Sequence, residues 1–363
     1  MAYTDIDKPS DYFNTKLYTG NGSSGHAITG VGFQPDLVWI KPRDQAYNHR
    51  LFDVVRGAGK KISSDTNSAE ATDTNEQTSF NSDGFTIGSD AGTNANTKTY
   101  ASWNWKAGTS VSGDTTGSGT LKTYTGSVNT TSGFSIIKYT GNGTAGHTIP
   151  HHLGVAPSAI FVKKLNELGD WSNYHSVLGN AGYMRLNNTN AFATASTYWN
   201  NTSPTSSVFT TGTTGNINGS GSTYIAICFA DVQGYSKIGS YIGNGNADGT
   251  FVYTGFKPAF ILRKRTDTTG AWLIQDNKRD GINRAVANSL PTDQNVLRAN
   301  DSSAEEFNNE LDILSNGFKL RATDAFGNAS GGTYIFAAFA SNPFVTSTGV
   351  PACARWLCSY LLT

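Results

Sequence analysis

Charge is scarce in this chain, and what charge there is cancels. Only 15% of the 363 residues are charged, with 27 basic residues against 27 acidic ones. A nucleic-acid-binding protein needs a surplus of Lys and Arg to neutralise phosphates. We therefore expect no nucleic-acid partner.

Long apolar runs are also missing. No segment reaches the roughly 18–20 continuous apolar residues that a membrane-spanning helix needs. Residues 1–7 lack the basic and apolar regions of a signal peptide. These absences predict a chain that does not insert into a membrane. They also predict that it is cytoplasmic, or is assembled in a cytoplasm before it leaves by another route.

Three cysteines are too few for a disulfide scaffold. Cys228 lies in an apolar run and is expected to be a small core residue. Cys353 and Cys358 belong to a C-terminal tail, 345–363, whose apolar end differs from everything before it. The sequence leaves open whether this tail docks on a neighbour or is poorly ordered.

Established catalytic motifs are absent as well. The sequence has no Gly-X-Ser-X-Gly elbow, no His-Glu-X-X-His, no Walker loop and no Cys-X-X-Cys pair. We therefore predict that the chain is not an enzyme, has no catalytic residues and needs no cofactor. His147, His151 and His152 lie close together, but a zinc site needs further ligands at suitable spacing. We expect them in a polar loop and predict no metal.

What the sequence does contain is a threefold internal repeat, which is sought before any other pattern. Tyr18-Thr-Gly-Asn-Gly22 and Tyr139-Thr-Gly-Asn-Gly143 are identical, and Tyr241-Ile-Gly-Asn-Gly245 differs at one position. Each copy is followed by a proline and an apolar run ending in lysine, and later by a second apolar strand. The lysines are Lys41, Lys163 and Lys264. One module used three times is the interpretation.

The composition favours strands over helices. There are 40 glycines and 12% aromatic residues, with Ser, Thr and Asn abundant. Aromatic and β-branched residues interrupted by Gly, Asn and Ser are typical of short strands and tight turns. We predict an all-β protein of three tandem β-sandwich repeats, of jelly-roll or lectin-like form.

The predicted organisation has five parts. We expect repeat 1 with a leader at 1–108, followed at 109–133 by a Gly/Ser/Thr-rich linker that is flexible by composition. Repeat 2 is expected at 134–231, repeat 3 at 232–344 and a C-terminal tail at 345–363. Within the linker, Leu121–Gly126 is a candidate for a stray strand on either neighbour. The segment Asp301–Phe307 is the one place where we expect a short helix, because it combines a cap residue with early acids.

Aligning the repeats on their prolines places corresponding residues in register. Asp53, His175 and Asp276 share one position, and four residues earlier stand His49, Trp171 and Trp272. Arg56 and Arg279 follow the two aspartates by three residues, with Leu178 at that place in repeat 2. We expect the aspartates to form structural ion pairs rather than a catalytic pair. His175 is expected to satisfy a hydrogen bond rather than to hold a metal.

Aromatic residues give the best candidates for a binding surface. Trp39 and Trp103 lie in apolar strands and are expected in the core. Aromatic rings outside such strands can stack on sugars or anchor protein contacts. On this ground we predict surface binding residues at Trp171, Tyr198, Trp199 and Trp272. Core packing is the alternative for each of them.

Several long motifs resemble one domain family. They are the Tyr-Thr-Gly-Asn-Gly turn and the segments 33–41, 79–88, 234–241, 276–280 and 314–321. They resemble a family of uncharacterised function that is abundant in tailed bacteriophages, particularly those of aquatic bacteria, and is often labelled tail or tail-fibre protein. The resemblance covers about residues 1 to 344. It implies a location in the virion, assembly in the host cytoplasm, and other virion proteins as partners.

Two functions follow as expectations. The first is a tail-fibre-like, receptor-binding virion protein that adheres to host surface glycans through exposed aromatics and Asn/Thr-rich loops. The second is a non-adhesive virion part, such as a capsid decoration, head fibre or adaptor, that contacts only neighbouring subunits. Many copies on the particle or a homo-oligomer, including a trimer, fit either. Three repeats could also form a pseudo-threefold body or match a threefold site on a particle. Solvent-exposed loop aromatics would favour the first function. Burial of these aromatics, or of the apolar tail 356–362, against a neighbouring subunit would favour the second.

Overall fold

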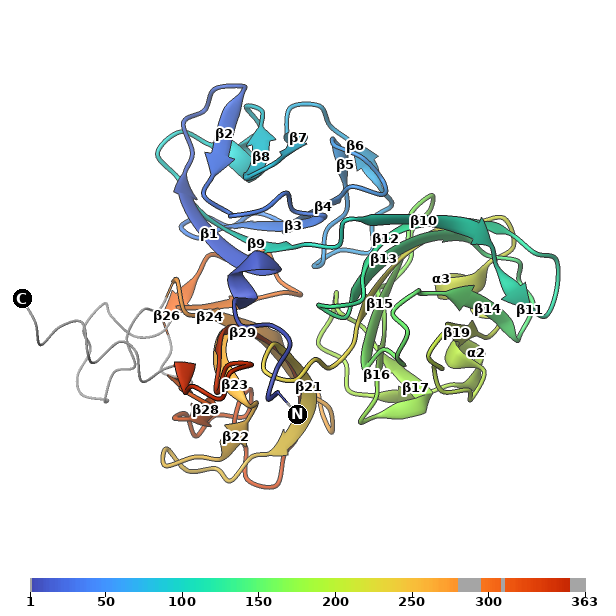
Figure 1. Ribbon diagram of the computed structural model, residues 1–363. Coiled ribbons are helices and arrows are strands. Elements are labelled where there is room, and N and C mark those ends of the chain that lie inside the picture. Colours follow the sequence, from blue (N-terminus) through green and yellow to red (C-terminus); the bar gives the residue numbers. More distant parts are fainter. Residues whose placement is uncertain (1, 280–294, 308–310, 353–363) are drawn as a thin grey trace, which may run out of the picture.

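The computed structural model describes residues 2–279, 295–307 and 311–352. The all-β prediction is confirmed, because antiparallel sheets dominate and the α-helices are single short turns: α1 (Ala91–Asn94), α2 (Ser196–Trp199) and α3 (Gly215–Asn218). In the described part of the chain, no helix has the length and apolarity needed to cross a bilayer. The strands group into three lobes (Figure 1).

Lobe 1 contains strands β1 to β9 and follows a short 3₁₀ turn, η1 (Pro9–Asp11). Its larger sheet has the order β1 (Phe13–Thr19), β9 (Thr99–Trp105), β3 (Leu37–Pro42), β4 (Arg50–Asp53). Its smaller sheet has the order β2 (His26–Thr29), β8 (Gly84–Ile87), β7 (Gln77–Asn81). A separate ribbon joins β5 (Lys60–Lys61) and β6 (Ala71–Thr72).

Lobe 2 contains β10 to β20. Its larger sheet has the order β10 (Thr109–Asp114), β12 (Thr123–Asn129), β13 (Phe134–Thr140), β20 (Thr223–Phe229), β15 (Ala159–Lys164), β16 (Ser172–His175), β17 (Gly179–Met184), β18 (Ala193–Thr194). Its smaller sheet has the order β11 (Thr116–Gly117), β14 (His147–Pro150), β19 (Val208–Thr211).

Lobe 3 contains β21 to β29. Its larger sheet has the order β21 (Ser236–Ile242), β29 (Thr333–Pro343), β23 (Phe256–Arg265), β24 (Trp272–Asp276), β25 (Asn295–Arg298), β26 (Glu306–Phe307). Its smaller sheet has the order β22 (Phe251–Tyr253), β28 (Gly317–Leu320), β27 (Leu311–Leu314).

One four-strand arrangement recurs in all three larger sheets: β1-β9-β3-β4, β13-β20-β15-β16 and β21-β29-β23-β24. The first two strands of each set pair in the same register, which places two tyrosines opposite each other. The rings stack at centroid distances of 5.0, 5.2 and 4.8 Å for Tyr18–Tyr100, Tyr139–Tyr224 and Tyr241–Tyr334. The sequence repeat is therefore also a repeat of contacts.

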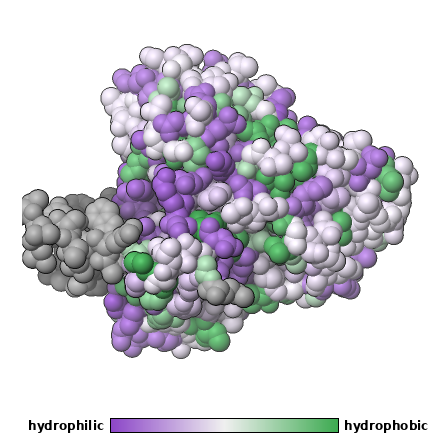
Figure 2. Space-filling view, in the orientation of Figure 1, coloured by the Kyte–Doolittle hydropathy of each residue, from purple (hydrophilic) through white to green (hydrophobic). Residues whose placement is uncertain are grey.

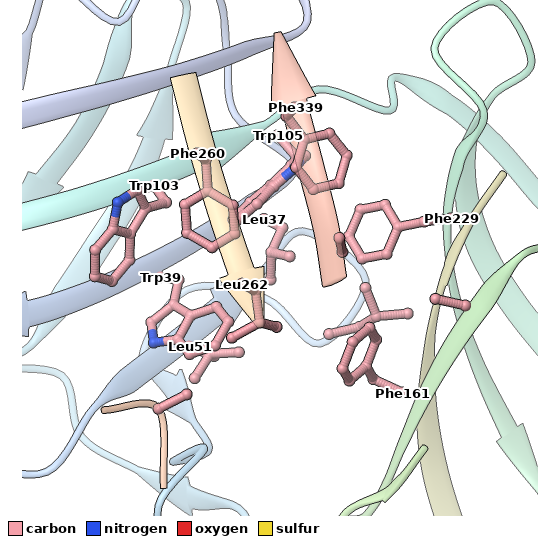
Figure 3. Close-up of a cluster of buried hydrophobic side chains, with 14 of the residues drawn as sticks. Leu37, Trp39, Leu51, Trp103, Trp105, Phe161, Phe229, Phe260, Leu262 and Phe339 are labelled. Atoms are coloured by element: carbon pink, nitrogen blue, oxygen red, sulfur yellow. The ribbon is translucent and has the colours of Figure 1, made fainter. Parts of the chain in front are cut away.

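The continuous apolar runs are buried on both faces, and the lobes explain why. One face of each larger sheet packs beneath its own smaller sheet, giving three separate cores. The opposite faces of the three larger sheets meet in a single central core. Figure 3 shows this core, where Trp105 of lobe 1, Phe229 of lobe 2 and Phe339 of lobe 3 lie together. Trp105 is 5.6 Å from Phe339 and 6.0 Å from Phe229 between ring centroids.

The repeated Gly-Asn-Gly turn is held by a buried asparagine from later in the same lobe. Asn94, Asn218 and Asn328 each accept a hydrogen bond at Oδ1 from the backbone N–H of the turn asparagine, at 2.9–3.0 Å. Their Nδ2 groups donate to the carbonyl of the residue two positions after the turn asparagine, at 2.8–2.9 Å. The second glycine of each turn has φ between +67° and +77°, a region that favours glycine. The motif is thus a structural clamp.

Two local predictions are wrong. Residues 109–133 do not form a flexible linker, because β10 and β12 extend the larger sheet of lobe 2 by pairing in sequence onto β13. Composition suggested flexibility, but backbone pairing to an open sheet edge outweighs it. The segment 301–307 is not helical, since residues 301–305 are irregular and β26 follows. Its backbone bonds to lobe 1 instead. The predicted tail is described only as far as residue 352, so Cys353 and Cys358 lie outside the described residues.

Candidate functional site

Three loops connect the lobes into a closed ring. Loop 63–70 of lobe 1 lies on lobe 2, loop 185–192 of lobe 2 lies on lobe 3, and loop 298–305 of lobe 3 lies on lobe 1. We call the three boundaries between lobes, each of which contains one of these loop contacts, seam 1–2, seam 2–3 and seam 3–1.

The seams share one backbone hydrogen-bond pattern. The N–H groups of Glu70, Phe192 and Glu305 donate to the carbonyls of Leu165, Thr266 and Arg43 at 2.7, 3.0 and 2.7 Å. In the reverse direction, the N–H groups of Gly169, Gly270 and Tyr47 donate to Asn67, Thr189 and Ser302 at 2.9, 2.9 and 2.8 Å. The receiving carbonyls lie two residues after the repeat lysine, and the reverse donors six residues after it. This is a pseudo-threefold arrangement built from one chain.

Two of the predicted surface aromatics are seam residues. The indole Nε1 of Trp171 donates to the carbonyl of Ser63 at 2.8 Å, and that of Trp272 donates to Arg185 at 2.8 Å. Trp171 is 0% exposed and Trp272 is 3% exposed. The prediction of surface exposure is therefore wrong for both. A buried indole N–H needs an acceptor, and these acceptors come from another lobe.

His49 takes the same place in seam 3–1. Its Nδ1 accepts a 2.8 Å hydrogen bond from Trp39 Nε1, which is a donor only, so the remaining proton lies on Nε2. Nε2 then donates to the carbonyl of Arg298 at 3.0 Å. Burial, with the Lys41 charge as a further cause, lowers the pKa of His49 well below its ordinary value. The imidazole is neutral at pH 7 and acts as a structural counterpart of the two indoles.

The repeat lysines are buried beside the same seams. Lys41, Lys163 and Lys264 are each at most 1% exposed, and each Nζ donates to the carbonyl of the next residue at 2.7–2.9 Å. Lys163 and Lys264 also reach across to the carbonyls of Asn67 and Thr189. Burial lowers the pKa of all three ammonium groups to about 8.

The aligned acids form buried ion pairs. Asp53 Oδ2 lies 2.5 Å from Arg56 Nε, and Asp276 Oδ2 lies 2.5 Å from Arg279 Nε, with almost no exposed side-chain surface in either pair. Asp276 also accepts a hydrogen bond from Trp103 Nε1 of lobe 1 at 3.0 Å. Both carboxylates are thus occupied by structural partners. At the third position His175 faces the Phe336 carbonyl, with 3.4 Å from Nε2 to the oxygen, and burial lowers its pKa to about 4.

Tyr198 and Trp199 are not surface residues either. They lie in α2 and are 5% and 1% exposed. Tyr198 stacks on Tyr183 with ring centroids 3.6 Å apart, and Trp199 packs edge-on against Tyr174 and Phe209 in the lobe 2 core. The flanking Thr and Asn residues suggested exposure, but one helical turn directs both rings inward. Trp39, Trp103 and Cys228 are buried as expected.

The clustered histidines serve separate hydrogen bonds. His147 contacts Asn218 Oδ1 at 3.0 Å and Thr115 Oγ1 at 2.7 Å. His151 contacts the Thr205 carbonyl, and His152 contacts the Tyr124 hydroxyl. Burial lowers the pKa of His151 to about 4. Their nitrogen atoms do not converge on a shared point.

An acidic group in lobe 1 does converge. Within the described ranges, carboxylate oxygens of Asp73, Glu76 and Asp90 lie within 4.8 Å of one another. Two cations already serve Glu76, since Arg50 Nε and Lys61 Nζ lie 2.8 and 2.7 Å from its Oε1. The chain itself therefore supplies positive charge to this group.

A pocket with a mixed polar and apolar lining lies at seam 3–1, and we call it the polar pocket. It has a volume of about 390 Å³ and lies between β1 of lobe 1 and strands β23 and β29 of lobe 3. Phe13 and three alanines contribute apolar surface. The polar lining used below consists of Ser10, Asn14, Thr15, Lys257, Asn277 and Lys278. Figure 2 shows hydrophilic residues gathered on this face where the upper and lower lobes meet.

These features define an all-β body of three sandwich-like lobes, closed by three similar seams, with no convergent catalytic group among the residues described. The chain belongs to the family described as a domain of unknown function (DUF7483), whose model matches residues 8–343. The match includes all three lobes. No curated protein and no solved structure matches the chain.

Proposed function

We propose that this chain is a structural component of a bacteriophage particle, acting as a non-adhesive part that contacts neighbouring subunits. The bacteriophage setting is inferred from the resemblance of its motifs. The observation that carries the structural role is the closed ring of three seams, in which aromatic, cationic and acidic residues are used for internal contacts. Such a body repeats one four-strand arrangement three times, which suits a threefold or quasi-threefold position on a particle.

Exposed apolar residues on lobe 3 offer a surface for contacts with neighbouring subunits. Ile242, Phe251 and Tyr253 of lobe 3 are 63%, 44% and 55% exposed. The positions equivalent to Phe251 and Tyr253 in β2 are Ala27 and Thr29. Lobe 3 therefore differs from lobe 1 on its outer sheet, and aromatic side chains are enriched where proteins meet.

The test is to locate the chain on purified particles. Mass spectrometry should detect it as a stoichiometric virion protein, and a cryo-electron-microscopy map should contain the three-lobed body against other subunits. Density at the free tip of a fibre, away from other subunits, would overturn the non-adhesive role. Absence of the chain from purified particles would overturn the virion assignment.

Adhesion to a host surface glycan is the second candidate. This candidate depended on aromatic residues that were predicted to be exposed. The structure buries them, so they do not support it. One other observation favours it, namely the polar pocket at seam 3–1 with its ammonium, amide and hydroxyl groups. A mixed polar and apolar pocket of this kind is suited to a small hydroxylated ligand.

A further inference from the structure

The polar pocket contains hydrogen-bonding atoms that the chain itself does not satisfy. Thr15 Oγ1 and Asn277 Oδ1 are both buried and have no hydrogen-bond partner. Buried polar atoms are nearly always paired, and an exception requires an explanation such as an unseen water, ion or ligand. Both residues line the same pocket, from β1 of lobe 1 and from the residue after β24 of lobe 3. The two atoms without partners therefore belong to residues that line one pocket.

The chemistry of the two atoms restricts what can satisfy them. An amide Oδ1 only accepts, so its partner must bring an O–H or N–H group, whereas a threonine hydroxyl can donate or accept. Asn277 is fixed in place because its backbone N–H donates to the Ala259 carbonyl at 3.0 Å. A ligand carrying hydroxyl groups meets both requirements.

The charge of the pocket adds a second restriction. Lys257 and Lys278 line it, and none of the described lining residues is acidic. Neither ammonium group forms an ion pair with any of the described residues. Ammonium groups without a carboxylate nearby favour an anionic ligand, because a charge-assisted hydrogen bond is stronger than a neutral one.

The corresponding pocket at seam 1–2 shows what a satisfied version looks like. There Asp36 stands at the place of Ala259, and it is bonded by Ser127 Oγ at 2.8 Å and by the backbone N–H of Ala107 at 2.9 Å. At that seam the chain itself supplies the hydrogen-bond partners of the buried carboxylate. Seam 3–1 has an alanine in place of this aspartate, and its Thr15 and Asn277 oxygens have no hydrogen-bond partner.

We propose that the polar pocket at seam 3–1 binds an acidic sugar, with Lys257 and Lys278 facing its carboxylate and with Thr15 and Asn277 bonding its hydroxyls. The volume of about 390 Å³ lies within the roughly 300–1,000 Å³ of small-molecule sites. The inference rests on the second candidate function, for which it names the ligand class. It is tested on the purified chain alone, so its outcome is independent of where the chain lies on a particle.

The experiment is a titration of the purified full chain followed by NMR and calorimetry. The probes are D-galacturonic acid and its α-1,4-linked dimer, neutral D-galactose, and inorganic phosphate. We expect the acids to bind at millimolar or lower concentration, galactose to bind at least about tenfold more weakly, and phosphate to give no saturable binding. Lys257→Gln and Lys278→Gln should each weaken the acid by about tenfold, the loss of one charge-assisted bond, and leave galactose unchanged.

Matched variants separate the site from general effects. Thr15→Val removes the hydroxyl at nearly constant shape, and Lys138→Gln removes a lysine from the larger sheet of lobe 2, outside the pocket. Thr15→Val should weaken acid and neutral sugar alike, whereas Lys138→Gln should change neither. Melting temperatures identify any variant that fails to fold, and the two pocket lysines give independent readings. Equal binding of phosphate and galacturonate, equal effects of Lys138→Gln and Lys257→Gln, or no binding at all would overturn the proposal.

Discussion

Seam 3–1 and seam 1–2 solve one problem with different residues. Each needs a buried N–H donor that reaches a carbonyl of the preceding lobe. Seam 1–2 uses the indole of Trp171, and seam 3–1 uses the imidazole of His49. The position therefore requires a ring with an N–H at one edge rather than a particular amino acid. The imidazole differs in one respect, because it can take up a proton.

A second contrast separates lobe 2 from the other lobes. Lobes 1 and 3 bury an aspartate–arginine pair at the end of β4 and β24, whereas lobe 2 has His175 and Leu178 there. A buried ion pair costs desolvation that its attraction roughly offsets. The molecule therefore tolerates both solutions, provided that no charge is left alone.

Breaking the ion pair should have the largest effect. Asp276→Asn removes the buried carboxylate that pairs with Arg279 Nε, although Glu305 still contacts Arg279 Nη1, and it weakens the contact from Trp103. We expect a loss of about 3 kcal/mol in the free energy of unfolding, the lower end of the range for a broken buried pair because Glu305 remains, measured by urea denaturation. The control is Asp11→Asn in the exposed pair with Lys8, which should change stability by less than about 1 kcal/mol. Equal losses in both variants would contradict the role of burial.

Giving lobe 2 the chemistry of the other lobes should be costly unless both residues change. His175→Asp places a carboxylate beside the Phe336 carbonyl with no arginine near it, and we expect a loss of about 3 kcal/mol. Adding Leu178→Arg should recover part of that loss. A double-mutant cycle measures the coupling, which we expect at about 1–3 kcal/mol. A coupling near zero would show that the alignment of the lobes does not extend to this pair.

Removing the indole N–H alone should have a medium effect. Trp171→Phe keeps an aromatic ring in the seam but leaves the Ser63 carbonyl without its donor. The expected loss is about 1–3 kcal/mol, the usual cost of an unsatisfied buried group. Trp272→Phe should give a similar value at seam 2–3, measured in the same denaturation assay. A cost below 0.3 kcal/mol at both positions would show that only ring packing matters.

Protonation of His49 should have the smallest effect on the free energy of unfolding, and this effect should appear only at acidic pH. The folded-state pKa is lowered, so below the unfolded value of about 6.5 the unfolded chain binds a proton that the folded chain does not. Stability is then lost as the pH falls from about 6.5, by at most about 1.4 kcal/mol per pH unit. His49→Gln keeps a donor and an acceptor but cannot titrate. Its unfolding free energy should depend less on pH between 7 and 5 than that of the unchanged chain.

Much of the fold could be predicted from local patterns. The apolar runs through Trp39, Phe161 and Leu262 indicated strands. The structure explains why these runs are continuously apolar, since each strand lies between an outer sheet and the central core. The stray strand expected at Leu121–Gly126 overlaps β12, which pairs with β13 of lobe 2. Strand β10 was not predicted, because Gly and Ser content describes the isolated segment and not the sheet edge that it meets.

The candidate site could be predicted less well. The acceptors of Trp171 and Trp272 lie 108 and 87 residues away, and no local pattern reports such a contact. One signal was present, since the repeat alignment puts His49, Trp171 and Trp272 in a single register. A shared N–H donor at that register indicates a shared acceptor. The pocket at seam 3–1 left no signal, because its unpaired atoms come from segments more than 250 residues apart.

Ring closure after the third lobe has a consequence for assembly. Each seam is a heterologous contact, in which a loop of one lobe meets a different surface of the next. Contacts of this kind between separate molecules grow into open filaments unless the rotation closes. Here it closes within one chain, so every donor loop and every receiving surface is already occupied. The fold therefore uses a contact geometry that could form a polymer, but the ring closes after three lobes. No further copy can be added through these surfaces.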